Sequence, residues 1–366
     1  MTSMDIVRST SAYERWLKAQ LHGDIVRKDI DRKHRRMGRG PFEFLRATFW
    51  RWAETILDVC PELANAPSVL AVGDIHVENF GTWHDAEGRL VWGVNDFDES
   101  AEMPYVLDLV RLATSAVVAD VRSMPVEAAC RQILDGYRAG LAEPQALVLD
   151  RQHAWLRKSF PVPAGSRAAF WKNFDPARTV AGARRSTPQR RYVSALKSAL
   201  PAAGIDLAYW PRTAGTGSLG RPRWVGFGLW RDAPLVREAK AMVASGWTRA
   251  HGPAGARLRC EEIASARHRS PDPWYRLKGT VLVRRLSPNN RKLDLAEVDA
   301  VTELVNDEVL WAMGRDLAAI HLGTGDHRAA IARDLARRKP QWLHTATKAA
   351  AAFVRREQKE WRKASR

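Results

Sequence analysis

Cysteine is scarce in this sequence, because the 366 residues contain only Cys60, Cys130 and Cys260. The three lie far apart and none belongs to a paired motif, which argues against a disulfide framework and against a cysteine-ligated zinc site. We expect all three to fill small, buried, apolar positions in a protein of a reducing compartment.

Long hydrophobic runs are also missing. No apolar run reaches the length of a membrane span, and the N-terminal segment MTSMDIVRSTSAYERW has no signal-peptide apolar region. These absences predict a cytoplasmic protein without a transmembrane segment. Apolar residues still make up 45% of the chain and there are 15 tryptophans, which favours a folded protein with a substantial core over a disordered one.

Acidic residues are few compared with basic ones. The 41 Asp and Glu residues face 58 Lys and Arg residues, which gives a formal net charge of +17. A balance of this kind predicts attraction to polyanions such as nucleotides, nucleic acid or anionic lipid. Residues 328–366 carry twelve Lys or Arg and three Asp or Glu. This stretch is either a solvated helix or a docking surface for nucleic acid or lipid, and the sequence leaves both open.

The stretch 72–99 places acidic residues after two short apolar runs at 69–72 and 90–94. Residues 85–88 between the runs have the composition of a hairpin turn, which would bring the two run ends together. The polar residues that follow the runs are Asp74, His76, Asn79, Asp96 and Asp98.

Oxygen-bearing side chains at this spacing favour phosphoryl-transfer chemistry. Asp74 and Asn79 match the D-x-x-x-x-N spacing of a catalytic loop, and carboxylate and amide oxygens suit Mg²⁺. We predict that Asp74 is the catalytic base, that Asn79 and Asp96 are metal ligands, and that Asp98 is an accessory ligand. His76 is a further catalytic candidate that either contacts a phosphate or bonds a backbone carbonyl.

Several motifs carry a resemblance to a known family. The segments GDIHVENFG, NDFDES and PYVLDLVRLATSA, with KHRRMGRGPFEFLRATF, GTGSLGRPRW and LAAIHLGTGD, are similar to the bacterial family known as domain of unknown function 2252. The same residues resemble, more distantly, the aminoglycoside and choline kinases. That likeness implies a protein-kinase-like fold, and it places Asp108 as the helix aspartate that braces the catalytic loop.

A glycine-rich segment at 213–220 supplies the second candidate motif. Gly215, Gly217 and Gly220 spell G-x-G-x-x-G, a pattern shared by Rossmann loops and by the loop that covers the phosphates in kinases. Two predicted strands separated by a turn follow it, which favours the kinase-type loop with Ser218 among its contacts. The second of these strands offers Arg237 and Lys240 as the phosphate-binding cation, on opposite faces, and the sequence does not choose between them.

The remaining pattern predicts helices at 11–36, 42–59, 105–119, 126–141 and 328–366, with a segment of short helices at 142–210. We divide the chain into N-terminal helices (1–66), a catalytic lobe (67–200), a nucleotide-binding lobe (201–290) and C-terminal helices that return to the catalytic lobe (291–366). Because the catalytic loop precedes the glycine-rich loop, the predicted fold is a two-lobed α+β, kinase-like fold in circularly permuted order.

The function predicted from these motifs is an ATP- and Mg²⁺-dependent phosphotransferase that acts on a small-molecule or protein hydroxyl. Three alternatives stay open. The same pocket could transfer AMP; the G-D-x-H sequence could belong to a metallophosphoesterase, although no G-N-H-[DE] follows it; or the chain could be a non-catalytic module that binds nucleotide or nucleic acid.

Overall fold

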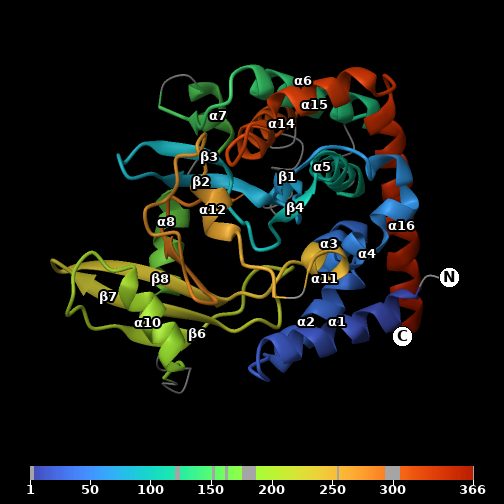
Figure 1. Cartoon of the computed structure of the whole chain (residues 1–366). Helices are drawn as coiled ribbons and strands as arrows, with labels where there is room; N and C mark the ends of the chain where they lie inside the picture. The colour runs from blue at the N-terminus through green and yellow to red at the C-terminus, as the bar shows by residue number, and fades with distance from the viewer. Residues whose placement is uncertain are drawn as a thin grey trace.

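The computed structural model describes residues 4–119, 124–150, 153–160, 164–174, 187–253, 255–292 and 306–365. Within these ranges the chain is a mixed helix and strand protein in which helix predominates and the strands form three small sheets (Figure 1). This composition agrees with the predicted α+β class. None of the helices in the described ranges is long and apolar enough to span a membrane.

The largest sheet is antiparallel throughout, has the strand order β6-β7-β8-β10-β9, and lies at the lower left of Figure 1. Arg231 and Asp232 join β7 to β8 with positive φ angles of 51° and 62°, the conformation of a tight hairpin turn. The predicted order of strand, turn and strand after the glycine-rich segment is therefore confirmed. The strands are β6 (Ala208–Pro211), β7 (Arg223–Trp230), β8 (Ala233–Ala241), β9 (Arg276–Lys278) and β10 (Val281–Leu286).

Two smaller sheets carry the predicted polar loops. The predicted hairpin turn at 85–88 is present, but it joins two strands that both follow Asp74. The apolar run that precedes Asp74 pairs instead with the strand after Asp98. The sheets are β1–β4 and β2–β3–β5, formed by β1 (Ser68–Ala71), β4 (Ala101–Pro104), β2 (Phe80–His84), β3 (Leu90–Val94) and β5 (Leu147–Val148).

The N-terminal region forms four helices where the sequence predicted two. His22 and Gly23 adopt positive φ angles and turn the chain, so the predicted helix 11–36 is divided in two. Thr48 has a non-helical backbone and divides the predicted helix 42–59 in the same way, and Pro41 is the first residue of the helix before it. These helices are α1 (Ile6–Gln20), α2 (Arg27–Met37), α3 (Pro41–Ala47) and α4 (Phe49–Val59), and η1 (Pro61–Leu63) follows them.

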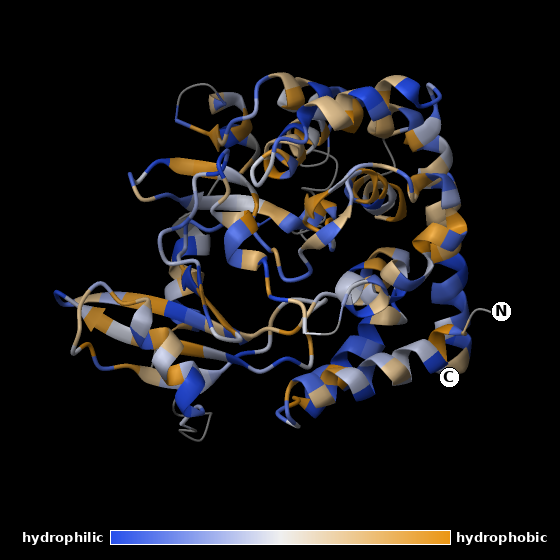
Figure 2. Ribbon diagram, in the orientation of Figure 1, coloured by the Kyte–Doolittle hydropathy of each residue, from blue (hydrophilic) through white to orange (hydrophobic). Residues whose placement is uncertain are grey.

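Two predicted helices after the polar loops are confirmed. Helix α5 (Val106–Val118) is buried on almost every side and is mostly hydrophobic in Figure 2. Helix α6 (Val126–Ala142) packs against α5 and against α14 (Asp307–His321). In 142–210 the described parts contain the predicted short helices, together with strands β5 and β6. The short helices here and after β8 are α7 (Ala154–Ser159), α8 (Ala164–Asn173), α10 (Arg190–Ser198), α11 (Gly246–His251) and α12 (Cys260–Ala264).

The C-terminal helices pack on the N-terminal helices and on α5. The basic segment 328–366 is two helices, α15 (Arg328–Arg337) and α16 (Trp342–Ala364), because Pro340 lies in the break between them. Helix α16 packs on α1, α3, α4 and α5 along the right side of Figure 1. The buried pair of Arg51 and Glu357, 2.6 Å apart, joins α4 to α16 across most of the chain's length.

Candidate functional site

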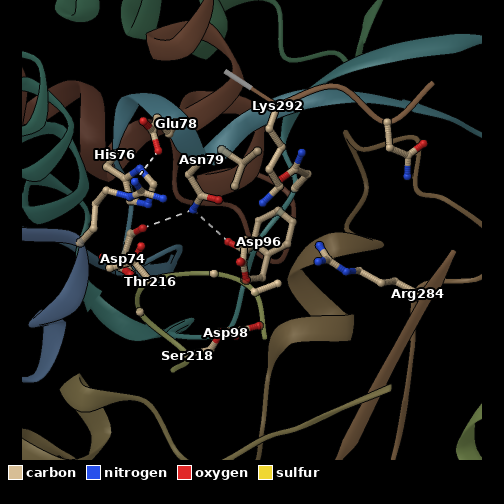
Figure 3. A pocket seen from close by; sticks show the side chains of 18 of the residues that line it. Asp74, His76, Glu78, Asn79, Asp96, Asp98, Thr216, Ser218, Arg284 and Lys292 are labelled. Carbon is tan, nitrogen blue, oxygen red and sulfur yellow. Dashed lines mark hydrogen bonds and ion pairs between the residues drawn. The ribbon is translucent and has the colours of Figure 1, made fainter. Parts of the chain in front are cut away.

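A single large cavity of about 1050 Å³ contains most of the predicted site residues. Its walls are the loop after β1, the loop after β3, the glycine-rich loop between β6 and β7, and residues of α2 and α3. Figure 3 shows the polar side chains of the first three loops converging on it. The predicted residues that line the cavity are Asp74, His76, Asn79, Asp96, Asp98, Gly215, Gly217 and Ser218.

Asn79 ties the two acidic loops together. Its side-chain Nδ2 donates to the backbone carbonyl of Asp74 over 3.2 Å and to that of Asp96 over 3.1 Å (Figure 3). Because the amide nitrogen is used by these bonds, the amide oxygen is the group left for a ligand. The spacing of Asp74 and Asn79 thus has a structural reason: a short 3₁₀ turn, η2 (Val77–Asn79), folds the Asn back over the Asp.

Asp108 braces the loop that carries Asp74. This fully buried carboxylate accepts the backbone N–H groups of Val72 over 2.7 Å and of Gly73 over 2.9 Å. Its Oδ2 atom also lies 3.0 Å from Nε2 of His321, whose other ring nitrogen bonds the hydroxyl of Tyr137. The buried groups of Asp108, His321 and Tyr137 form one hydrogen-bonded network that holds the loop. These bonds agree with the bracing position expected for Asp108.

Arg111 is the direct partner of Asp74. Its Nη2 atom donates to Oδ1 of Asp74 over 2.5 Å and to the carbonyl of Leu45 over 2.8 Å. The guanidinium lies 5.0 Å from the ring centres of both Phe49 and Trp52. Burial raises the pKa of the Asp74 carboxyl, and the nearby charge of Arg111 opposes that rise. Asp74 therefore keeps a fixed orientation with its second oxygen directed away from Arg111.

Lys240 holds the second acidic loop. Its ammonium pairs with both oxygens of Asp98 and lies 3.6 Å from Oδ1 of Asp96. Burial favours the neutral form of Asp96, but Lys240 and Lys292 outweigh it and keep its pKa well below the usual value. For Asp98, burial and the neighbouring Asp96 raise the pKa. Asp96 is thus the ionised carboxylate that faces the cavity, and Asp98 is engaged by Lys240.

Arg237 lies away from the cavity. Its Nε atom donates to the carbonyl of Ala199 over 2.6 Å, and its guanidinium stacks 4.6 Å from the ring centre of Trp274. Arg237 and Lys240 do lie on opposite faces of β8, as their odd spacing requires. The structure places Lys240 beside the acidic loops and does not place Arg237 there.

The glycine-rich loop connects two neighbouring antiparallel strands and covers one side of the cavity. A Cβ on Gly217 would stand 2.9 Å from Oδ2 of Asp74, so the loop tip lies against the loop that carries Asp74. Within the described residues, the backbone N–H groups of Thr216, Gly217 and Ser218 have no acceptor. Gly220 differs in role: a Cβ there would lie 2.4 Å from the Ile30 side chain, so this glycine permits packing on α2.

Helix α2 anchors the glycine-rich loop along its length. The buried ammonium of Lys33 donates to the carbonyl of Gly217 over 2.8 Å, and Arg36 donates to the hydroxyl of Thr216 over 2.6 Å. At the two ends of the loop, Thr213 donates to Asp29 over 2.8 Å and the carbonyl of Gly220 accepts the N–H of Val26 over 3.0 Å. The N-terminal helices therefore take part in the site.

A positively charged wall faces the acidic loops across the cavity. Arg212, Arg223 and Arg284 all pair with the one buried carboxylate of Glu238. Burial would raise the pKa of Glu238, but these three arginines hold it well below the usual value. All three arginines also line the cavity. Three cations around one anion leave an excess positive charge at this wall.

His76 is neutral in this site. Burial lowers its pKa well below 6.5, and Arg46 and Arg111 lower it further. Its Nδ1 atom is buried and has no hydrogen-bond partner in the described part of the chain, so the predicted bond to a backbone carbonyl is not observed at this nitrogen. The ring packs edge-on against Phe42, with 6.1 Å between the ring centres.

Several residues that line the cavity or hold its loops were not singled out as site candidates in the sequence, and one of them had a readable signal. Arg111 follows Asp108 by one helical turn, and these are the charged residues of the otherwise apolar helix α5. Such charges in a buried helix require partners, which marks them as structural or functional. Lys33, Arg212, Arg223, Arg284 and Lys292 had no comparable signal in a chain with 58 basic residues.

A metal site made only of protein side chains is not observed. In the described ranges, no group of three or more His, Cys, Asp and Glu side chains has an arrangement that could hold a metal ion. The predicted set of Asn79, Asp96 and Asp98 contains one amide and two carboxylates, of which Asp98 is engaged by Lys240, and this is fewer ligands than such a cage requires.

The fold and the site define an α+β protein with a deep cavity that presents carboxylates on one side and arginines on the other. Residues 26–157 match the family described as "Uncharacterized protein conserved in bacteria (DUF2252)". This match agrees with the resemblance predicted from the sequence, and the matched segment includes Asp74, Asp96, Asp108 and helix α2. No curated protein and no solved structure matches the chain.

Proposed function

We propose that this protein is an ATP- and Mg²⁺-dependent phosphotransferase. The observation that carries the proposal is the meeting of two motifs that are more than a hundred residues apart in the sequence. Asn79 joins the loops of Asp74 and Asp96, and the tip of the glycine-rich loop at Gly217 lies against Asp74. Catalytic loop, metal loop and phosphate loop around one cavity form the arrangement that phosphoryl transfer requires.

The residues at the acidic side fit a magnesium ion that is shared with phosphates. Mg²⁺ usually binds through one or two protein oxygens and completes its coordination with water and phosphate oxygens. Asp96 supplies an ionised carboxylate, and Asn79 supplies an amide oxygen whose partner nitrogen is already bonded. When bound, the metal would neutralise charge on the transferred phosphoryl group.

The glycine-rich loop and the arginine wall of the cavity fit a nucleoside triphosphate. The N–H groups of Thr216, Gly217 and Ser218 are available as donors to phosphate oxygens, and Arg284 lines the same cavity. Beyond Arg212, the cavity reaches the aromatic side chains of Phe170, Phe174 and Trp210, a surface suited to a purine base. A volume of about 1050 Å³ is at the upper end for a small-molecule pocket and exceeds what one nucleotide needs.

Asp74 would act on the acceptor hydroxyl. Its free oxygen, Oδ2, borders the cavity and the loop tip, while Arg111 fixes the other oxygen. In the reaction the hydroxyl proton passes to Asp74, a bond forms from the hydroxyl oxygen to the γ-phosphorus, and the bond from that phosphorus to the leaving oxygen of ADP breaks. Burial raises the pKa of Asp74, which makes it a better base near neutral pH than an exposed aspartate.

The fold proposal accompanies the functional one. The antiparallel sheet β6-β7-β8 carries the glycine-rich loop and Lys240, as the nucleotide-binding sheet of a kinase does, and the loops of Asp74 and Asp96 precede it in the chain. The packing of α16 on α1, α3 and α4 supports a circularly permuted kinase-like fold, in which N- and C-terminal helices complete one helical region.

The test is a thermal-shift titration of the wild type and of Asp96→Asn with ATP, with and without MgCl₂. We expect ATP to raise the melting temperature of the wild type more strongly with Mg²⁺ present, and we expect Asp96→Asn to lose the Mg²⁺-dependent part of that shift. Asp135→Asn, on the exposed face of α6, is the matched control. Equal shifts for wild type and Asp96→Asn would remove the support for the metal ligand. Labelling with ATP that carries ³²P at the α or γ position then separates AMP transfer from phosphoryl transfer.

A further inference from the structure

We propose that the acceptor is a small hydroxyl compound that carries a phosphate or carboxylate group, held by Arg36, Arg39 and Arg46. This inference rests on the proposed phosphotransferase function and extends it to the substrate class. All three arginines line the same cavity as Asp74 and come from α2, α3 and the turn between them.

These arginines lie at the Asp74 end of the cavity, beside the tip of the glycine-rich loop, where Arg36 donates to Thr216. In Figure 3, Asp74, His76, Glu78 and Thr216 lie at one end of the view and Arg284 lies at the other, with Asp96 and Lys292 between them. Arg46 belongs to the first end, because its Nη1 atom lies 2.5 Å from Glu78. An anionic acceptor bound here would lie next to Asp74 and next to the loop tip that would hold the phosphates, which would place its hydroxyl close to both the base and the transferred group.

The arginines keep donors for a ligand. Arg39 is exposed, and in the described ranges its guanidinium has no acceptor. The Nε atom of Arg46 is buried and also has no acceptor in those ranges. Arg36 uses Nη1 to bond Thr216, which leaves its other nitrogens. A guanidinium presents five donors in a planar fork, so phosphate and carboxylate are the groups that match it best.

The charge balance at this end of the cavity is positive. Arg36, Arg39 and Arg46 face the carboxylates of Glu43 and Glu78 among the lining residues, and the charge of Asp74 is matched by Arg111. Burial lowers the pKa of Arg36, and the neighbouring Arg32, Arg46 and Arg39 lower it further, with Glu78 opposing them. The potential that acts on Arg36 is therefore positive, which favours an anion and disfavours a cationic acceptor.

During transfer the anionic group would not react. It would remain on the arginines while the hydroxyl of the same molecule loses its proton to Asp74 and gains the phosphoryl group. Fixing the acceptor at two points orients its hydroxyl, and orientation is a main contribution to the rate when the protein performs little covalent chemistry.

The test is calorimetric titration of the nucleotide-free protein with four probes: inorganic phosphate, glycerol 3-phosphate, glycerol and choline. We expect the two phosphates to bind and glycerol and choline not to bind. The double variant Arg36→Ala/Arg39→Ala should weaken phosphate binding at least tenfold. Arg32→Ala/Arg35→Ala removes the same charge from exposed positions of α2 that do not line the cavity, and it should change binding less than twofold.

Three results would overturn the proposal. The first is that neither phosphate binds, and the second is that choline binds as tightly as glycerol 3-phosphate. The third is equal weakening of phosphate binding by the two double variants, which would mean a diffuse charge effect and no site. A different pattern separates this proposal from the phosphotransferase function. If ATP does not raise the melting temperature of the wild type but phosphate binding still depends on Arg36 and Arg39, the phosphotransferase function is contradicted and the anion site is supported.

Discussion

The ammonium of Lys33 donates to the backbone carbonyl of Gly217 over 2.8 Å, and it joins an N-terminal helix to the tip of the glycine-rich loop. Lys33 is buried, and its charge lies 5.2 Å from the ring centre of Tyr13 and 4.7 Å from that of Trp50. The loop that would cover the phosphates is therefore anchored by α2, and Lys33 supplies the contact to Gly217 at its tip.

Replacement of Lys33 should give a stability change that depends on pH. Burial lowers the pKa of Lys33 from 10.5 to about 7, with Arg221 adding to the effect and Glu99 and Asp74 opposing it. Between pH 7 and pH 10.5 the unfolded chain therefore holds a proton that the folded chain does not. Stability of the wild type should rise with pH in this window, by at most about 1.4 kcal/mol per pH unit from this group.

Lys33→Met lacks this titration. The difference in free energy of unfolding, variant minus wild type, should be largest below pH 7, because there the folded wild type bears the full cost of a buried charge. This difference should fall by roughly 2 kcal/mol between pH 7.5 and 9.5. The lost hydrogen bond to Gly217 adds an offset that does not vary with pH. Urea unfolding at several pH values measures the difference, and a difference that stays constant with pH would contradict the prediction.

Gly217→Ala should impair the site without unfolding the protein. The added Cβ would stand 2.9 Å from Oδ2 of Asp74 and 3.2 Å from the carbonyl of Arg46, so the loop tip must move away from the catalytic loop. We expect about tenfold weaker ATP binding, a loss of about 1.4 kcal/mol. Gly165→Ala is the control, because a Cβ there meets open space. Unchanged ATP affinity in Gly217→Ala would show that the loop tip is not in contact with the nucleotide.

Lys240→Met should weaken ATP binding, whereas Arg237→Met, on the same strand, should lower only the stability of the protein. Lys240 balances the adjacent carboxylates of Asp96 and Asp98, so its loss should weaken Mg²⁺-dependent ATP binding about tenfold. Arg237 bonds Ala199 and stacks on Trp274, so its loss should lower the melting temperature and leave the ATP affinity unchanged. Equilibrium dialysis with ATP on both folded variants tests the pair, and the reverse pattern would assign the phosphate contact to Arg237.

Asp108→Asn should destabilise the whole chain. The carboxylate accepts two backbone N–H groups and a contact from His321, and the amide that replaces it turns a donor toward one of these groups. We expect the free energy of unfolding to fall by about 2–4 kcal/mol, as for other buried charged hydrogen-bonding groups that lose a partner. Asp135→Asn, with a side chain 49% exposed, should change it by less than about 0.5 kcal/mol. Similar denaturant midpoints for the two variants would contradict the bracing role of Asp108.

The local features of the site could be read from the sequence. The spacing of Asp74 and Asn79, the hairpin turn at 85–88 and the helix that begins after Tyr105 depend on residues close together in the chain. Turn residues, strand alternation and helical periodicity express backbone preferences that act over a few residues. Two predicted helices were wrong because each is divided in two, at His22 and at Thr48. At these places one or two backbone angles interrupt an otherwise helical pattern.

The pairing of distant residues was decided by tertiary structure alone. The sequence did not choose between Arg237 and Lys240, and it did not indicate that α2 would hold the loop at Gly217 or that Arg111 would hold Asp74. With 58 basic residues, many cations are chemically equivalent partners for each carboxylate. Which one pairs depends on which faces are buried together, because burial makes an unpaired charge costly and so selects among partners that local sequence treats alike.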